Sequence, residues 1–442
     1  MKIVFLLLFI FIVFFRISLA DELISKFYTS TRAFIDINKN FFKGTSFEDI
    51  VELRQRFFAR LDWSPYDNLL FAISGKADLN YYWGGFNRGE GQIISWGKTD
   101  FSPLDVFSKY DLREGLLFEQ ELVKIPVFSL RLRKTFDYFS FDLGFEPFWT
   151  RPRYKTVGSD WAFLSWSSLQ RSTSDKNDIK PLLDGTFNPF VEDFPKADLS
   201  SFSTGIWTDF FLEGFDFGFL VFTGYDIFPL PFFDEGFLAG VKRQPGKPEE
   251  KLSDISMAEI FSPMISEQKP FITLRPSRFW VLGGGASTEI KGFIVKSDIG
   301  FFIDTKFIDD NLLVLPLPAL NLAFQIEKEI FNDFFAIPSI RELMVVTEKK
   351  LFALGNFNSF PSILIRYVFL DDFEILGGTI LDLRPDTATT VRSYSHSAGI
   401  TYSYKDNMKL SAGFLLLDGE RISPFGLLKE NSVFSFSFKY IF

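Results

Sequence analysis

The sequence predicts an all-β fold, a transmembrane antiparallel up-and-down β-barrel of about sixteen strands (range roughly 14–18). Phe alone occurs 60 times and aromatic residues make up 18% of the chain, yet the hydrophobic fraction of 47% and the mean hydropathy of +0.11 are ordinary. Such values result when apolar residues alternate with polar ones instead of gathering in helices. After position 20, no uninterrupted apolar segment reaches the length of a membrane helix. A chain of this composition that spans a membrane does so with strands.

The last ten residues, 433–442, alternate without a break. Successive side chains of a strand point to opposite faces, so one face here is aromatic and the other mostly polar, as a wall between lipid and a wet lumen requires. The segment resembles the terminal strand by which bacterial outer-membrane barrels are recognised for assembly. This resemblance implies the barrel-assembly machinery as a partner, with an assembly signal made of five aromatic residues: Phe434, Phe436, Phe438, Tyr440 and Phe442.

The first twenty residues have the pattern of a cleaved signal peptide. Lys2 precedes an apolar run at 3–15, and the small-x-small site Ser18-Leu19-Ala20 follows. A membrane anchor is the competing interpretation, but the run is shorter than the ~20 residues of a membrane span, and Arg16 interrupts it. We therefore expect a signal peptide at 1–20, and no cysteine follows it that could carry a lipid.

Residues 21–50 are ambiguous. Phe27, Phe34 and Phe41 recur every seven residues, which suits an amphipathic helix, whereas the Thr and aromatic residues of 28–37 suit a strand. We expect a short N-terminal periplasmic or plug-like segment here, with the transmembrane barrel at 51–442.

Period-two alternation is clear from position 51 onwards. Three early strands are predicted near 53–63, 128–133 and 139–146, and charged residues recur on their polar faces. Charged side chains on the inner face of a barrel set its selectivity. The expected pore constriction comprises Arg54, Arg56, Arg60, Arg131, Arg133, Asp142 and Glu146.

Further strands are predicted along the rest of the chain, separated by polar connections. The long connections at 151–198 and 242–270 are expected outside the cell, because outer-membrane barrels have long extracellular loops and short periplasmic turns. The other strands are expected near 69–83, 200–213, 215–229, 278–290, 292–307, 318–330, 334–347, 360–371, 373–384, 390–405 and 407–418.

A set of short motifs occurs in order within 51–165. Trp96-Gly97 leads into an Asp-containing loop, a Pro-x-Asp step at 103–105 and Asp-Leu-Arg-Glu at 111–114, and Glu146-Pro-Phe-Trp and Gly-Ser-Asp-Trp at 158–161 follow. These motifs are similar to those of a family of porin-like outer-membrane barrels of unknown function. The resemblance implies a barrel with a structured loop and no established substrate.

The same stretch reads physically as an ordered loop, because Ser102-Pro103 and the surrounding acids make a poor strand. We expect it to fold into the lumen and pair with the wall arginines, since a buried arginine without a partner is costly. Two interpretations remain open: the charges set a transverse field across a narrowed pore, or they only fasten the loop. The expected lumen-loop residues are Asp100, Asp105, Asp111, Arg113 and Glu114.

Residues for catalysis are scarce. The chain has no Cys, and its single His, His396, shares strand parity with the apolar residues Ala398 and Ile400, which indicates the lipid side rather than a general base. Gly283-Gly284-Gly285 lacks the context of a phosphate loop and indicates a bulge or room for a neighbouring side chain. No enzymatic activity, metal or cofactor is expected. A formal charge of −9 argues against nucleic acid as a partner.

The expected function is that of a porin-like channel of the cell outer membrane, in which small polar or ionic solutes diffuse passively through a water-filled lumen with a charged constriction. Outer-membrane lipid and small solutes would be its partners, and the sequence does not indicate an oligomeric state. One alternative is a facilitator for hydrophobic compounds with a plugged lumen, which inward-facing Phe58, Leu220 and Phe222 favour. The other is a structural or adhesive barrel that uses its long loops.

Overall fold

The structure is a computed structural model of the 442-residue chain. It describes residues 23–36, 50–66, 69–80, 85–91, 94–110, 124–125, 127–152, 155–157, 162–164, 187–196, 198–227, 229–243, 269–309, 311–351, 354–370, 372–383, 391–405, 407–420, 423, 425–426 and 432–441. For residues 23–91, 155–164 and 240–243, and for residue 441, the description covers the backbone alone.

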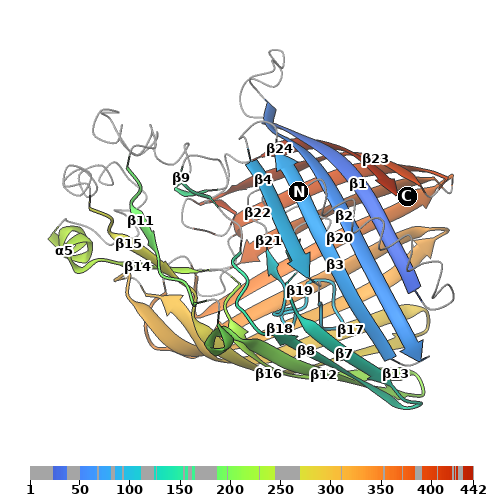
Figure 1. Cartoon of the computed structure of the whole chain (residues 1–442), viewed down its shortest axis with the longest axis horizontal. Coiled ribbons are helices and arrows are strands. Elements are labelled where there is room, and N and C mark those ends of the chain that lie inside the picture. The colour runs from blue at the N-terminus through green and yellow to red at the C-terminus, as the bar shows by residue number, and fades with distance from the viewer. Residues whose placement is uncertain are drawn as a thin grey trace.

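Seventeen strands of the described part form one sheet that closes on itself as a barrel (Figure 1). Strands that follow one another along the wall pair antiparallel, and the last strand, β24, pairs antiparallel with β1. Strand β3 pairs with β4 along Ser74–Asn80 and with β7 at Leu69 and Leu70, so β4 and β7 share one place in the wall. Because β4 and β7 share one position, the seventeen strands occupy sixteen positions around the wall. The predicted up-and-down barrel of about sixteen strands is confirmed.

The strands of the wall, in chain order, are β1 (Leu23–Asp36), β2 (Ile50–Tyr66), β3 (Leu69–Asn80), β4 (Gly85–Gly91), β7 (Leu130–Thr135), β8 (Phe139–Glu146), β12 (Ser203–Leu212), β13 (Phe215–Tyr225), β16 (Arg278–Ile290), β17 (Phe293–Ile308), β18 (Val314–Phe331), β19 (Phe334–Val345), β20 (Phe357–Phe369), β21 (Phe373–Leu383), β22 (Val391–Tyr404), β23 (Met408–Gly419) and β24 (Val433–Ile441). The connections contain β5 (Lys109–Tyr110), β6 (Lys124–Ile125), β9 (Lys155–Val157), β10 (Ala162–Leu164), β11 (Phe190–Glu192), β14 (Leu230–Phe233), β15 (Ile272–Arg275), the 3₁₀ turn η4 (Leu199–Ser201) and the helix α5 (Glu235–Arg243).

Side chains alternate between the two faces of the wall as the sequence predicts. In β8, Ser140, Asp142 and Glu146 are buried on the lumen side, whereas Phe139 lies on the outside with 37% of its surface exposed. On the outer face of β13, Phe219 and Val221 are 58% and 50% exposed. Exposure of so much apolar surface to water is unfavourable. Apolar patches of this kind mark contact with a membrane or a protein.

The two ends of the barrel differ. Two-residue turns join β12 to β13 and β16 to β17, and short turns also join β7 to β8, β18 to β19, β20 to β21 and β22 to β23 at the same end. In the turn after β16, Lys291 and Gly292 both have positive φ (51° and 74°), as a two-residue hairpin turn requires. Long connections follow β8 and β13 at the other end. Strand β1 begins and β24 ends at the short-turn end, because every neighbouring pair is antiparallel.

The expected periplasmic or plug-like segment at 21–50 is wrong for residues 23–36. Leu23–Asp36 is wall strand β1, paired with β2 on one side and β24 on the other. The seven-residue recurrence of Phe suggested a helix, but hydrogen bonding to two neighbouring strands overrides so weak a local preference. The predicted signal peptide at 1–20 lies outside the described residues and stays a prediction.

Most predicted strands agree with the wall to within a few residues. The strand predicted at 278–290 is β16, and that predicted at 373–384 is β21. Of the connections predicted to be long, 151–198 contains β11. This strand pairs with β15, which follows 242–270, and β15 pairs with β14, which precedes it, so the three form a small sheet at the edge of the barrel beside α5 (Figure 1). None of the described helices is long and apolar enough to cross a bilayer.

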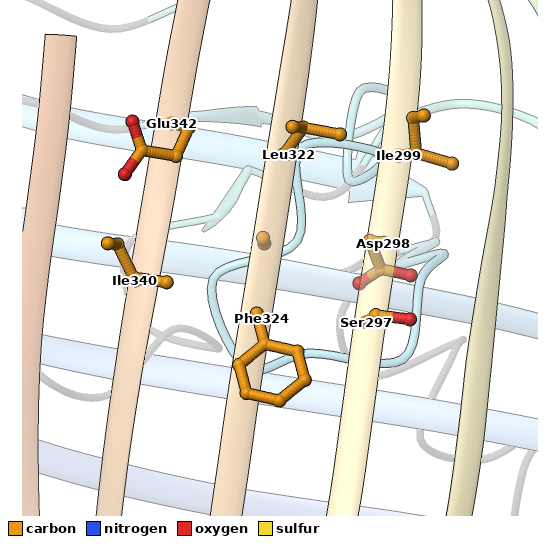
Figure 2. Close-up of a pocket in the computed structure, with 8 residues that line it drawn as sticks. Ser297, Asp298, Ile299, Leu322, Phe324, Ile340 and Glu342 are labelled. Carbon is orange, nitrogen blue, oxygen red and sulfur yellow. The ribbon is translucent and has the colours of Figure 1, made fainter.

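The outer wall has a shallow hollow of about 370 Å³ across β17, β18 and β19. Figure 2 looks onto this face, where Ile299, Leu322 and Phe324 surround the hollow. Glu342 also lies here, and its Oε1 accepts a hydrogen bond from Ser359 Oγ at 2.8 Å. The outside of the wall is therefore apolar with isolated polar pairs.

Candidate functional site

The candidate site is the lumen loop, which we define as residues 94–110, together with the inner wall that it contacts. The chain leaves the wall after β4 and returns to it at β7, beside the same strand β3. The described residues between these strands, 94–110, 124–125 and 127–129, thus belong to an excursion from a single wall position (Figure 1). Because both ends of the excursion are held in the wall, the loop can only lie across the lumen or leave through a mouth.

An apolar cluster fixes the base of the loop to the wall. Trp96, Leu104 and Phe107 of the loop pack on lumen-facing residues of three strands, among them Leu220 and Phe222 of β13. The rings of Trp96 and Phe107 meet edge to face with centroids 5.3 Å apart, and Phe107 meets Phe222 at 6.1 Å. Each fully buried large side chain contributes about 1.5–3 kcal/mol. The cluster therefore holds the loop firmly against this side of the barrel.

Glycines in the wall make room for the cluster. A Cβ at Gly144 would lie 2.8 Å from the Phe107 ring, and one at Gly205 would lie 2.8 Å from the Trp96 ring. A Cβ at Gly283 would lie 2.4 Å from Leu104 Cδ2. The sequence interpretation of Gly283 as room for a neighbouring side chain is confirmed, and the neighbour is a residue of the loop.

Polar contacts fix the tip of the loop. Asp298 of β17, which is 2% exposed, accepts hydrogen bonds from Lys98 N at 2.9 Å, Thr99 N at 2.7 Å and Thr99 Oγ1 at 2.6 Å. Lys98 Nζ reaches Asp209 of β12 at 2.8 Å. Hydrogen bonds to an ionised acceptor are about twice as strong as neutral ones. One buried carboxylate therefore organises the turn at Gly97, whose φ is +110°.

Asp100 extends the contact to β18. Its backbone N–H donates to Gln325 Oε1 at 2.9 Å, and Gln325 Nε2 donates to Asp100 Oδ2 at 3.0 Å. Lys296 Nζ lies 4.0 Å from Asp100 Oδ1 and 3.2 Å from Glu327 Oε2. The Asp100 side chain is 43% exposed, so it presents negative charge to the open lumen.

The returning half of the loop is held by buried charges. Asp105 pairs with Lys124 of β6, and burial raises the pKa of Asp105 although Lys124 opposes the shift. Lys109 is fully buried and donates from Nζ to the carbonyl oxygen of Tyr225 at 2.8 Å. Burial lowers the pKa of Lys109, and the charges of Glu146 and Asp226 oppose that shift.

Asp226 completes this buried group. Burial raises the pKa of Asp226 to about 7, with the nearby Lys109 acting in the opposite direction. Oδ2 of Asp226 and Oε2 of Glu146 are both buried without a hydrogen-bond partner among the described residues. Glu146 Oε1 accepts from Thr150 N at 2.7 Å. The ionisation of Asp226 is therefore poised near neutral pH.

The expected pairing of loop acids with Arg131 is wrong. Arg131 of β7 instead pairs with Asp142 on the adjacent strand β8, with Nε to Oδ1 at 2.8 Å. Trp96 Nε1 also donates to Asp142, at 3.4 Å. Asp142 lies on the adjacent strand and is buried, so Arg131 pairs with it and not with Asp100 or Asp105. Arg133 is exposed and has no ion pair with another described residue.

The remaining expected site residues are only partly described. Arg54, Arg56 and Arg60 occupy alternate positions of β2 opposite Asn80, Asp78 and Ser74 of β3, and their side chains lie outside the description. Asp111, Arg113 and Glu114 also lie outside the described residues. Their part in a constriction stays a prediction.

Two predictions about other surfaces can be compared with the structure. His396 lies on the outer face of β22, where its Nδ1 is 2.8 Å from Thr379 Oγ1. Phe434, Phe436, Phe438 and Tyr440 lie on β24, which joins β23 to β1, whereas Phe442 lies outside the described residues. In the described part of the chain, no cluster of three or more His, Cys, Asp or Glu could hold a metal ion.

The sequence interpretation missed the residues that anchor the loop tip: Lys98, Thr99, Asp209, Asp298 and Gln325. The three wall anchors, Asp209, Asp298 and Gln325, lie on polar strand faces that look like ordinary lumen wall. The signal that could have found Asp298 is its place between Gly283-Gly284-Gly285 and Gly300, since lumen-facing glycines mark the wall where the loop rests.

Comparison with known proteins gives weak structural likenesses only. No known protein family and no curated protein matches the sequence. Salmonella typhi OmpF in complex with daunomycin aligns with a TM-score of 0.46 and 11% identity over 95% of this chain and 97% of that chain. A mutant porin of Rh. blastica gives 0.39 and 8% (95% and 100% covered), and a loop-deletion mutant of OmpT, an outer membrane protein of Vibrio cholerae, gives 0.41 and 10% (96% and 100% covered). All these TM-scores lie below 0.5, so the assignment of the fold rests on the strand pairings of this chain.

Proposed function

We propose that the protein is a porin-like channel of the cell outer membrane, through which small polar or ionic solutes diffuse passively. The observation that carries the proposal is the closed sixteen-position barrel with an apolar outside, a polar inside and a loop docked in the lumen. Barrels of this size leave room for water. The exposed apolar residues of the outer wall would contact outer-membrane lipid.

In this proposal the short-turn end faces the periplasm and the long connections face outwards. The chain would be exported with removal of residues 1–20 and folded by the barrel-assembly machinery, with β24 as the recognised strand. Closure of the ring by β24 against β1 supports that role, because the barrel has no complete wall until this last strand pairs.

The lumen loop would form the constriction. It covers the inner wall from β8 to β18, so the free passage runs between the loop and the opposite wall, which includes β2. We propose that Arg54, Arg56 and Arg60 line that opposite wall, while Asp100 faces them from the loop. Filtering would then depend on width and on charge at this level.

A plugged facilitator for hydrophobic compounds gains no support from the described lumen. Leu220 and Phe222, which favoured it, are 1% and 0% exposed because the loop covers them. No apolar surface of β13 is left on the lumen side for a greasy ligand. The adhesive alternative has no specific observation in its favour.

Conductance in planar bilayers tests the proposal. The purified barrel should give ohmic single-channel currents, and liposomes that contain it should swell in small sugars but not in large ones. Replacing Arg54, Arg56 and Arg60 together with Gln should shift the reversal potential in a salt gradient. A folded, inserted barrel without current would reject the channel, and an unchanged reversal potential would remove the arginines from the constriction.

A further inference from the structure

Buried charges lie where the lumen loop returns to the wall, and the proposed filtering does not use them. Lys109 of the loop is fully buried, and its Nζ donates a hydrogen bond to the carbonyl oxygen of Tyr225 at 2.8 Å. Glu146, at the end of β8, is also fully buried. Asp226 directly follows β13, and its backbone N–H donates to the carbonyl oxygen of Ser277 at 2.8 Å. We call Lys109, Glu146 and Asp226 the buried charge group.

The hydrogen bonding of this group is incomplete. Glu146 Oε2 and Asp226 Oδ2 are buried without a hydrogen-bond partner among the described residues. The same holds for Oγ of Ser203, which is the direct cross-strand partner of Glu146. A buried polar network that is only partly satisfied costs free energy, because each unpaired atom has lost its contact with water. Opening of this part of the loop would return that water, so the returning end is held less firmly than the apolar cluster.

The charged groups that face Asp226 come from the loop and from the wall. Burial raises the pKa of Asp226 to about 7, whereas Lys109, a backbone hydrogen bond with Ser277 and Lys306 of β17 act in the opposite direction. Glu146 of β8 faces Lys109. Burial lowers the pKa of Lys109, and the charges of Glu146 and Asp226 oppose that shift. Lys109 therefore connects the loop to both carboxylates of the wall.

The sign of the coupling to pH follows from these directions. Release of the loop would take Lys109 away from Asp226 and admit water, so the pKa of Asp226 would return towards 3.8. The docked state holds the Asp226 proton more tightly, so docking is favoured below about pH 4 and loses free energy as the pH rises to about 7. The lowered pKa of Lys109 has the opposite effect at higher pH, because docking regains free energy between that lowered value and 10.5.

We propose that the buried charge group is a pH-sensitive switch on the returning end of the lumen loop, residues 108–110. Protonated Asp226 keeps this end docked, and deprotonation releases it. The apolar cluster around Trp96 and Phe107 does not include residues 108–110 and stays in place. The switch itself rests on the contacts of the loop, whereas its effect on solute flow rests on the proposed channel.

Thiol labelling measures the release directly, because the chain has no native cysteine. Ser108 is fully buried in the docked loop, so the thiol of Ser108→Cys should react with a water-soluble maleimide only after release. Division by the rate for Ser200→Cys, an exposed position, corrects for the pH dependence of thiol reactivity. In the folded barrel in detergent, the corrected rate should rise by about tenfold or more from pH 5 to pH 7 and fall again towards pH 10.

Two substitutions in the Ser108→Cys protein identify the groups that titrate. Asp226→Asn should remove the rise between pH 5 and pH 7. Lys109→Met should extend the rise to higher pH and remove the alkaline fall, because Lys109 lowers the pKa of Asp226 and would no longer titrate itself. The control Asp234→Asn, which changes an exposed carboxylate in the same connection, should keep the profile of the parent. A flat profile in the parent, or an equal rise in folded Asp226→Asn, would overturn the switch.

Bilayer recording separates the switch from the channel. Open-channel noise of wild type should be larger at pH 7 than at pH 5, and Asp226→Asn should show no such difference. Labelling that depends on pH in a folded barrel without current would reject the proposed channel and leave the switch standing. Ohmic current together with labelling that does not depend on pH would reject the switch alone.

Discussion

Asp298→Ala should free the tip of the lumen loop while the base stays docked. The substitution removes the acceptor of three hydrogen bonds, from Lys98 N, Thr99 N and Thr99 Oγ1. A hydrogen bond to a charged group contributes about 1.5–3 kcal/mol, so independent bonds would add up to about 4.5–9 kcal/mol. Bonds that share one acceptor are not independent, and we expect a loss of about 4 kcal/mol in docking of the tip.

That loss is large compared with thermal energy. About 1.4 kcal/mol changes an equilibrium tenfold, so the undocked fraction of the tip should rise roughly a thousandfold. The apolar cluster around Trp96 and Phe107 does not involve Asp298 and should persist. The variant should therefore keep the barrel and its constriction on average, but the constriction should fluctuate.

Single-channel recording gives the readout. Asp298→Ala should show flickering open current and a higher mean conductance than wild type, with normal heat-modified mobility on gels to prove that the barrel is folded. Asp209→Ala serves as the comparison, because it removes the largely buried ion pair with Lys98 but leaves the backbone bonds intact, so it should loosen the tip less than Asp298→Ala does. Current noise identical to wild type in a folded Asp298→Ala barrel would refute the anchoring role of Asp298.

Three other outcomes follow from the same contacts. Gly144→Ala should destabilise the docked loop by about 1–3 kcal/mol, because the new Cβ would lie 2.8 Å from the packed Phe107 ring, and adding Phe107→Leu should restore stability. The control is Gly377→Ala, whose Cβ would have its nearest contact at 3.4 Å, and an unchanged stability of Gly144→Ala would contradict the packing. Burial raises the pKa of Asp226 from 3.8 to about 7, so the unfolded chain releases the Asp226 proton at lower pH than the folded barrel does. The stability that protonated Asp226 contributes should therefore decline from about pH 4 to about pH 7. The stability of Asp226→Asn should depend less on pH over that window. An unaltered pH profile in Asp226→Asn would exclude Asp226 as the titrating group. Deletion of 433–442 should abolish assembled barrel in isolated membranes, because β23 and β1 would both be left as open edges, and normal heat-modified barrel from the truncated chain would contradict closure by β24.

The wall could be predicted from the sequence because one physical pattern repeats in every strand. The alternation in 139–146 or 433–441 places each side chain on its face without knowledge of any neighbour, since a strand has a period of two. The prediction failed at β1, where Phe27 and Phe34 fit a helical spacing and the deciding contacts come from β2 and from the far end of the chain. Pairing across 400 residues leaves no local signal in the segment itself.

The loop was predicted to lie in the lumen, but its partners were not. Asp100 and Asp105 contact Gln325, Lys296 and Lys124, whereas wall arginines were expected. Opposite charge alone does not determine which cation pairs with a given carboxylate. Several cations lie in the lumen, and the interaction energy depends on the distance between the charges. Arg131 shows this directly, since it pairs with Asp142 on the adjacent strand and not with Asp100 or Asp105.

The exceptions to the alternation carry the missing information. Apolar residues on the lumen face look like errors in a polar lining, yet each cluster of them in the described part is covered by a connection. Leu220 and Phe222 are covered by Phe107 of the lumen loop, Ala319 and Val345 by Leu351, and Leu415 and Leu417 by Phe425. An uncovered apolar side chain in a wet lumen would lose the stabilisation of burial, so its presence indicates that something packs on it.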